Sequence, residues 1–209
     1  FRTLADYVAD MKEAQKEIFF ITGATVQEMA ASPYLEAFRK KDYEVLFLVD
    51  EVDDFIFSGF EYKGKSFKSI LKGEIELDPS KTEEKEKAVK EFGKLIDLIK
   101  ATLKDEVKDV RLSGRLTDSP CCLVAEEGTM DSQMEKLLKA MGQTVPREQK
   151  ILEINPAHPL FAAMNRVFES DRESPLLKEY TSLLYDQALI LEGSRPKDPT
   201  AFVQRLAKL

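Results

Sequence analysis

The fold class follows from two apolar runs, Ile18-Phe19-Phe20-Ile21-Thr22-Gly23 and Val45-Leu46-Phe47-Leu48-Val49. Both are short and rich in aromatic and β-branched residues, which is typical of buried strands. Helix signals come after each run: one helix is expected from about Thr25, a second from Ser32-Pro33, and a third from Asp50. Strand, helix, strand, helix in this order predicts a small α/β/α layer with parallel strands.

The rest of the chain predicts a second, mixed α/β domain. A turn-forming stretch at Leu77-Asp78-Pro79-Ser80 separates the two parts, so we place the domains at residues 1–78 and 79–209. In the second part, the pattern predicts a long helix over 80–103, strands over 107–112, 121–124 and 151–154, a helix over 128–141, and three helices after His158. The last two form a helical hairpin. The fold class is therefore α/β, or α+β when the chain is taken as a whole.

Composition excludes several functions. The net charge of −7, with 10 basic and 16 acidic residues in 1–78, gives nucleic-acid binding no support. A single histidine, His158, cannot supply a multi-histidine metal site. No GxGxxG, GxxxxGK[ST] or GxSxG motif occurs, so we expect neither an enzyme nor a bound cofactor. No apolar run is long enough to span a membrane, and the adjacent Cys121 and Cys122 favour a reducing, cytoplasmic compartment.

Two apolar helix faces are candidates for binding. The first, which we call the methionine-rich face, lies on one side of the helix expected over 128–141. It comprises three methionines and two leucines: Met130, Met134, Leu137, Leu138 and Met141. This face is either part of the core or a surface that adapts to varied partners, because methionine repacks easily. The second lies on the terminal hairpin and comprises Leu176, Leu177, Tyr180, Leu183, Leu184, Gln187, Ala188, Leu191, Phe202, Leu206 and Leu209. It either closes its own domain or pairs with a second copy as a four-helix bundle.

Four motifs in chain order resemble the ninety-kilodalton heat-shock chaperone family. They are LADYVADMKEAQKEIFFITG at 4–23, SPYLE at 32–36 with YEVLFLVD at 43–50, RLTDSPCCLV at 115–124, and LEINPAHP at 152–159. They lie in order along essentially the whole chain. The short form of the sequence, without a long charged linker, is most similar to the bacterial type of this family.

The resemblance implies a segment of an ATP-dependent chaperone that acts in protein folding and stress response. Residues 1–78 would be the last subdomain of its middle domain, and 79–209 its C-terminal dimerisation domain. ATP and Mg²⁺ are expected only with the family's N-terminal domain, so no catalytic, cofactor or metal residue is expected here. The implied client-contacting residues are Asp54 and Phe55 together with the methionine-rich face. The implied dimer contact is the apolar face of residues 175–209.

The implied partners are a second copy of the chain and unfolded or partly folded client proteins, with neither nucleic acid nor membrane. An alternative is a purely structural module that dimerises and transmits motion while clients bind elsewhere. Burial of Met130, Met134 and Leu138 would favour that alternative.

Overall fold

The computed structural model describes residues 2–50, 52–57, 59–77, 82–129, 138, 141–142 and 149–208. The chain forms two compact units, the first from Phe1–Ile75 and Ala125–Glu148, the second from Glu76–Val124 and Gln149–Leu209. The predicted boundaries place residues 125–148 in the second domain, 79–209. In the structure these residues group with the first unit instead. The boundary expected between 78 and 79 lies outside the described residues, and the domain assignment stays a prediction.

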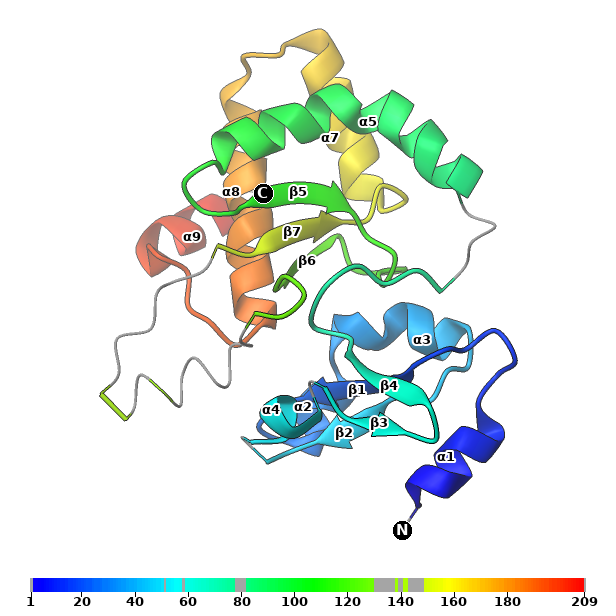
Figure 1. Cartoon of the computed structure of the whole chain (residues 1–209). Coiled ribbons are helices and arrows are strands. Elements are labelled where there is room, and N and C mark those ends of the chain that lie inside the picture. The colour runs from blue at the N-terminus through cyan, green and yellow to red at the C-terminus, as the bar shows by residue number, and fades with distance from the viewer. Residues whose placement is uncertain are drawn as a thin grey trace. The chain divides into compact units, whose positions relative to one another are not determined.

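The first unit is built on a four-stranded sheet in the order β2-β1-β4-β3 (Figure 1). Strand β1 (Ile18–Thr22) pairs in parallel with β2 (Leu46–Leu48) and β4 (Lys65–Ser69), while β3 (Glu61–Tyr62) pairs antiparallel with β4. The register places Phe20 opposite Leu46, and Ile18 opposite Phe67. The predicted parallel α/β layer is confirmed.

The helices of this unit are short and start where the local signals lie. They are α1 (Leu4–Asp10), α2 (Val26–Ala30), the 3-10 turn η1 (Pro33–Leu35), α3 (Glu36–Lys40) and α4 (Asp53–Phe57). The Thr25 side chain caps α2, and Ser32 accepts a hydrogen bond from the backbone N–H of Tyr34 at the start of η1. The expected helix from Asp50 starts instead at Asp53, whose carboxylate accepts a hydrogen bond from the Asp50 backbone.

The β3–β4 hairpin was not predicted from the sequence beyond a turn at Gly64. Its two turn residues, Lys63 and Gly64, both have positive φ, at 51° and 72°, which is the conformation of a tight type I′ turn. Residues 61–68 carry charged side chains on both faces, so the alternation that signals a strand is weak. Phe67 is the exception and joins the core formed by Tyr7, Ile18 and Phe20.

Tyr7 connects three segments of the first unit through its hydroxyl group. The hydroxyl donates to the Glu44 carbonyl at 2.8 Å and accepts from the Phe19 backbone N–H at 3.0 Å and from Gln15 Nε2 at 2.9 Å. Burial raises the pKa of this phenol above its usual value of 10.0, while its hydrogen bonds from Phe19 and Gln15 act in the opposite direction.

The second unit has a three-stranded sheet in the order β5-β7-β6. Strand β7 (Ile151–Ile154) pairs in parallel with β5 (Asp109–Leu112) and antiparallel with β6 (Cys121–Val124). Helix α5 (Thr82–Thr102) packs against β5, and α8 (Pro175–Leu191) against β6. Helices α7 (Pro159–Ser170) and α9 (Pro199–Leu206) complete the unit by packing on α8.

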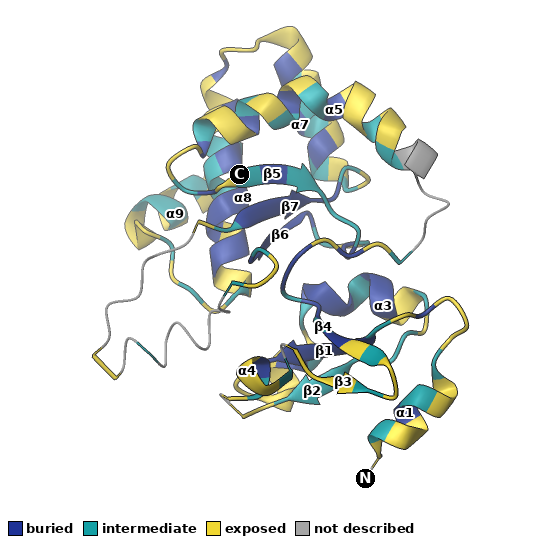
Figure 2. Cartoon of the chain, viewed as in Figure 1, coloured by how far each residue is buried: buried dark blue, intermediate teal, exposed yellow. Residues whose placement is uncertain are grey.

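The core of the second unit lies between its sheet and its helices (Figure 2). Leu152 and Ile154 of β7 contribute to it from the sheet, and Leu95 and Ile99 from α5. His158 caps α7 by accepting from the Leu160 backbone through Nδ1, which accounts for the single histidine as a structural residue. The predicted fold class, α+β overall, is confirmed.

Candidate functional site

Helix α4 buries an acidic residue on its inner face. Asp54 is 6% exposed, and its Oδ2 lies 2.5 Å from the Nζ of Lys72, which is also 6% exposed. Phe57, three residues further on and therefore on the same face, stacks at 4.8 Å between ring centroids against Phe67. Asp54 therefore directs its carboxylate inward to Lys72, which follows β4, and its expected contact with a client stays a prediction.

The outer face of α4 is apolar. Phe55 is 78% exposed, Val52 is 50% exposed and Ile56 is 53% exposed. We call these three residues the α4 surface. Val52 lies just before α4, and its carbonyl accepts a hydrogen bond from the Ile56 backbone at 3.1 Å. The spacing of one, three and four residues therefore places all three side chains on one side, opposite Asp54 and Phe57. Helix α4 buries Asp54 while Phe55 and Ile56 stay exposed, which departs from ordinary amphipathic packing, and an exposed apolar cluster of this kind is typical of an interaction site.

The methionine-rich face is placed only in part. Met130, Met134 and Leu137 lie outside the described residues. Leu138 is helical and half-buried, and Met141 is 66% exposed. The structure therefore does not decide whether this face is core or surface, and its role stays a prediction.

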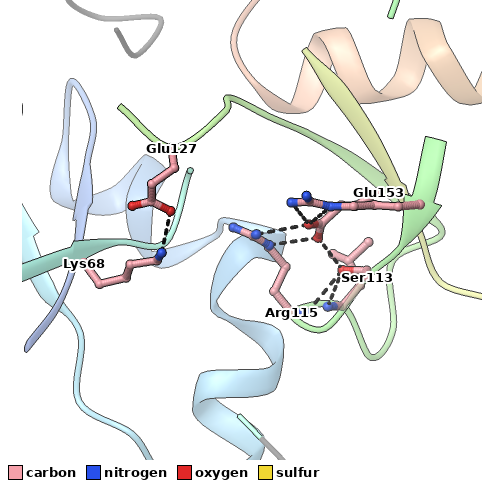
Figure 3. Close-up of polar contacts among 7 residues, drawn as sticks. Lys68, Ser113, Arg115, Glu127 and Glu153 are labelled. Carbon is pink, nitrogen blue, oxygen red and sulfur yellow. Dashed lines mark hydrogen bonds and ion pairs between the residues drawn. The ribbon is translucent and has the colours of Figure 1, made fainter. Parts of the chain in front are cut away.

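The segment leading to the methionine-rich face is held to the first unit at its start. Ala125 forms a β-bridge with Lys72, and its carbonyl accepts from the Gly73 backbone at 2.9 Å. The Lys68 ammonium then pairs with the Glu127 carboxylate at 2.5 Å (Figure 3). These contacts join the end of β4 to residues 125–127.

The predicted dimer residues fall into three groups. Leu177, Leu184 and Ala188 belong to the core of their own unit, and Tyr180, Leu183 and Phe202 are half-buried. The exposed members are Leu176, Gln187, Leu191 and Leu206, and Leu209 lies outside the described residues. The inward face of α8 is thus used within its own unit, and the exposed residues remain available to a second copy.

Two exposed residues of the hairpin were not singled out from the sequence. Ile190 on α8 is 46% exposed, and Val203 on α9 is 60% exposed. Val203 precedes Leu206 by three residues, so both lie on one side of α9, and this spacing could have identified the pair. An ion pair between Arg205 and Asp186, with Nη1 and Oδ2 3.0 Å apart, holds α9 against α8.

A buried charged cluster in the second unit was also missed. The Glu153 carboxylate on β7 accepts hydrogen bonds from Arg115, Arg111 and Ser113, with Arg111 Nη2 at 2.8 Å and Ser113 Oγ at 2.8 Å (Figure 3). Arg115 and Glu153 are essentially inaccessible to solvent. Arg115 lies in the motif RLTDSPCCLV, and Glu153 lies in the motif LEINPAHP. The presence of each residue in one of these motifs is the signal that could have linked the pair.

The described residues offer little for chemistry. Burial raises the pKa of Cys121 to about 12, so its thiol is a weak nucleophile. No three His, Cys, Asp or Glu side chains come together to hold a metal ion within the described ranges. Among the helices of that part of the chain, none has the length and apolarity needed to cross a membrane.

Comparison with known proteins agrees with the motif resemblance. The family model described as Hsp90 protein matches residues 1–209. The chain therefore belongs to the Hsp90 family of chaperones. It is 47% identical over 217 residues to the chaperone protein HtpG of Geobacter sulfurreducens, covering 100% of this chain and 33% of that protein.

Other bacterial relatives give the same result. The HtpG chaperone of Paraburkholderia xenovorans is 44% identical over 207 residues, and that of Mycobacterium avium is 44% identical over 209 residues. Those alignments cover 97% and 98% of this chain, and 32% of each relative. The chain spans about a third of the length of the curated relatives it matches.

Proposed function

We propose that this chain supplies client-protein binding and homodimerisation to an ATP-dependent molecular chaperone. The family of the chain and the chaperone names of its relatives support the general role. ATP hydrolysis is assigned to a different domain of the family, so these residues bind partners and carry out no reaction. The chain would act in the cytoplasm, on unfolded or partly folded proteins.

One observation carries the client-binding proposal: the exposure of Phe55 on α4, beside the exposed Val52 and Ile56. An exposed Phe side chain gains roughly 1.5–3 kcal/mol when a partner buries it. Such a contact is weak alone and selects apolar segments without requiring a particular sequence. Folded proteins bury those segments, whereas unfolded proteins present them to solvent, which matches the requirement for a client-binding surface.

Dimerisation would turn weak contacts into useful affinity. Two copies joined through the exposed residues of α8 and α9 would present two α4 surfaces to one client chain. The second contact is then favoured by its high effective concentration, without any new interaction. The exposed Val203 and Leu206 on α9 support this role for the hairpin.

The test is a fluorescence-anisotropy titration of the chain into a labelled, permanently unfolded protein. We expect saturable binding by the parent chain and at least about fivefold weaker binding by Phe55→Ser, corresponding to about 1 kcal/mol. The matched control is Val89→Ser on α5, because Val89 is also well exposed, at 54%, but lies in the second unit. Equal saturable binding by all three proteins would contradict a client site at α4, whereas binding by none of them would favour the purely structural module.

A further inference from the structure

The three parallel strands of the first unit end at one edge of its sheet, which we call the carboxyl edge. Strands β1, β2 and β4 run in the same direction, with Phe20 opposite both Leu46 and Ser69. The turns after β1 and β2, which lead into α2 and α4, therefore start side by side. Exposed apolar side chains lie there in addition to the α4 surface, since Val26 at the start of α2 is 56% exposed and Val49 after β2 is 48% exposed.

The carboxyl edge also carries acidic side chains. Asp50 follows Val49, Asp53 is the first residue of α4, and Glu28 lies in the first turn of α2. We call Glu28, Asp50 and Asp53 the acidic rim. The Asp53 carboxylate accepts a hydrogen bond from the Asp50 backbone at 3.1 Å, which keeps these two residues together. None of the three carboxylates takes part in an ion pair with another described residue.

In the described part of the chain, basic side chains near the carboxyl edge are engaged elsewhere. Residues 42–62 contain seven acidic residues and neither lysine nor arginine. At the end of β4, the ammonium groups of Lys68 and Lys72 pair with other carboxylates. The Arg39 guanidinium donates to the Ala30 carbonyl at the end of α2. The acidic rim therefore gives an exposed apolar surface a negative potential.

The opposite edge of the sheet has balanced charges. Lys16 and Glu17 lie just before β1, and Lys41 and Asp42 lie before β2. The Lys12 ammonium is 3.5 Å from the Asp42 carboxylate. Each acid there has a lysine close by in sequence or in space, whereas the acids of the carboxyl edge stand beside exposed apolar side chains.

We propose that the α4 surface and the acidic rim together select unfolded client segments that carry lysine or arginine beside apolar residues. This preference rests on the proposed function and names the class of segment that the site takes. The α4 surface covers the apolar side chains, and the acidic rim attracts the neighbouring cations. Because the rim is largely exposed, it acts mainly through the rate of association, and salt screens its effect. Segments rich in aspartate or glutamate are repelled.

The test compares three labelled peptides that differ only in charge. Each has about 15 residues, with the same leucine, phenylalanine and valine positions in a flexible Gly- and Ser-rich sequence, and three further positions hold lysine, glutamine or glutamate. At about 50 mM salt, fluorescence anisotropy with the full chain should give the tightest binding for the lysine peptide and the weakest for the glutamate peptide. The two Kd values should differ by at least about fivefold, and by less than about twofold at 500 mM salt.

The kinetics and a rim variant identify the source of this difference. In stopped-flow measurements, the lysine peptide should associate faster, with similar dissociation rates for all three peptides. The triple variant Glu28→Gln, Asp50→Asn and Asp53→Asn should reduce the difference in Kd to less than about twofold and leave binding of the glutamine peptide unchanged. Asparagine caps helices about as well as aspartate, so α4 should keep its start.

A matched control removes the same charge from the opposite edge. The triple variant Glu13→Gln, Glu17→Gln and Asp42→Asn changes the net charge equally, and asparagine tolerates the φ of 55° at position 42. This control should keep the preference for the lysine peptide. Circular dichroism checks that both triple variants are folded.

The outcomes separate the charge preference from client binding itself. Equal affinity of the parent chain for all three peptides, or the same preference in the rim variant and its control, would overturn the charge preference and leave the proposed function standing. Binding of none of the peptides would refute both. A second copy of the chain is the competing occupant: self-association that the rim variant abolishes, without peptide binding, would assign the surface to that copy.

Discussion

Arg115 and Glu153 are 38 residues apart in sequence, yet Arg115 Nε donates to Glu153 Oε2 at 2.9 Å with 0% and 1% of their side chains exposed. Arg111 donates to the same carboxylate, so one anion serves two guanidinium groups. The cluster fixes β7 and the turn after β5 to each other. It is a structural centre of the second unit.

Replacing the shared carboxylate should be severe. Glu153→Gln removes the negative charge that pairs with two guanidinium groups, one of them fully buried. This change should lower the free energy of unfolding by about 3–5 kcal/mol. Urea denaturation followed by circular dichroism measures this loss. The matched control is Asp109→Asn, which breaks a largely exposed pair with Lys100 and should cost much less. Equal losses in the two variants would contradict a special role for the buried cluster.

Replacing two glycines by alanine, one at a time, should change the stability of the chain in opposite directions. Gly73→Ala places a side chain at a φ of +59° and against Glu127, and should destabilise the chain by about 1–2 kcal/mol. Gly93→Ala lies within α5, where nothing stands within 4 Å of the added Cβ, and should stabilise by up to about 1 kcal/mol. Thermal or urea denaturation of both variants gives the comparison. A stabilising Gly73→Ala would show that the turn after Lys72 is not strained by a side chain.

Tyr7 should make stability fall at alkaline pH. Burial raises the pKa of this phenol in the folded chain above its usual 10.0, so the folded state keeps its proton after the unfolded state has lost it. Its contribution is fully present below about pH 10 and is lost as the pH rises through the folded-state pKa. Urea midpoints measured from about pH 8 to pH 11 should decline more steeply for the parent chain than for Tyr7→Phe. Parallel declines would contradict the raised pKa.

The hairpin offers a test of dimerisation that leaves the core untouched. Val203→Glu combined with Leu206→Glu places charges on the exposed side of α9, so the proposed dimer should dissociate to folded monomers at micromolar concentration. Analytical ultracentrifugation measures the mass, and circular dichroism the folding. Leu184→Asp is the contrasting variant. Leu184 is 1% exposed within its own unit, so this change should lower the free energy of unfolding by at least about 3 kcal/mol. An unchanged dimer mass in the α9 variant would place the interface elsewhere.

Local signals predicted much of the fold from the sequence. The apolar run at 18–21 and the run at 151–154 became strands β1 and β7, and the helix starts at Thr25, Ser32 and His158 follow their capping chemistry. The β3–β4 hairpin was missed because its strands are short and highly charged. The candidate sites were predicted only in outline: Phe55 is exposed, but Asp54 beside it is buried.

The sequence by itself determined the family, the fold class and the positions of most elements. These properties depend on motifs and on short-range periodicity, which are complete within a few neighbouring residues. The tertiary structure alone decided that Asp54 turns inward to Lys72, that Leu184 belongs to the core while Leu206 does not, and that Arg115 meets Glu153. The reason is physical: the partner of a buried charge, or the side of a helix that is covered, depends on residues brought together from distant parts of the chain.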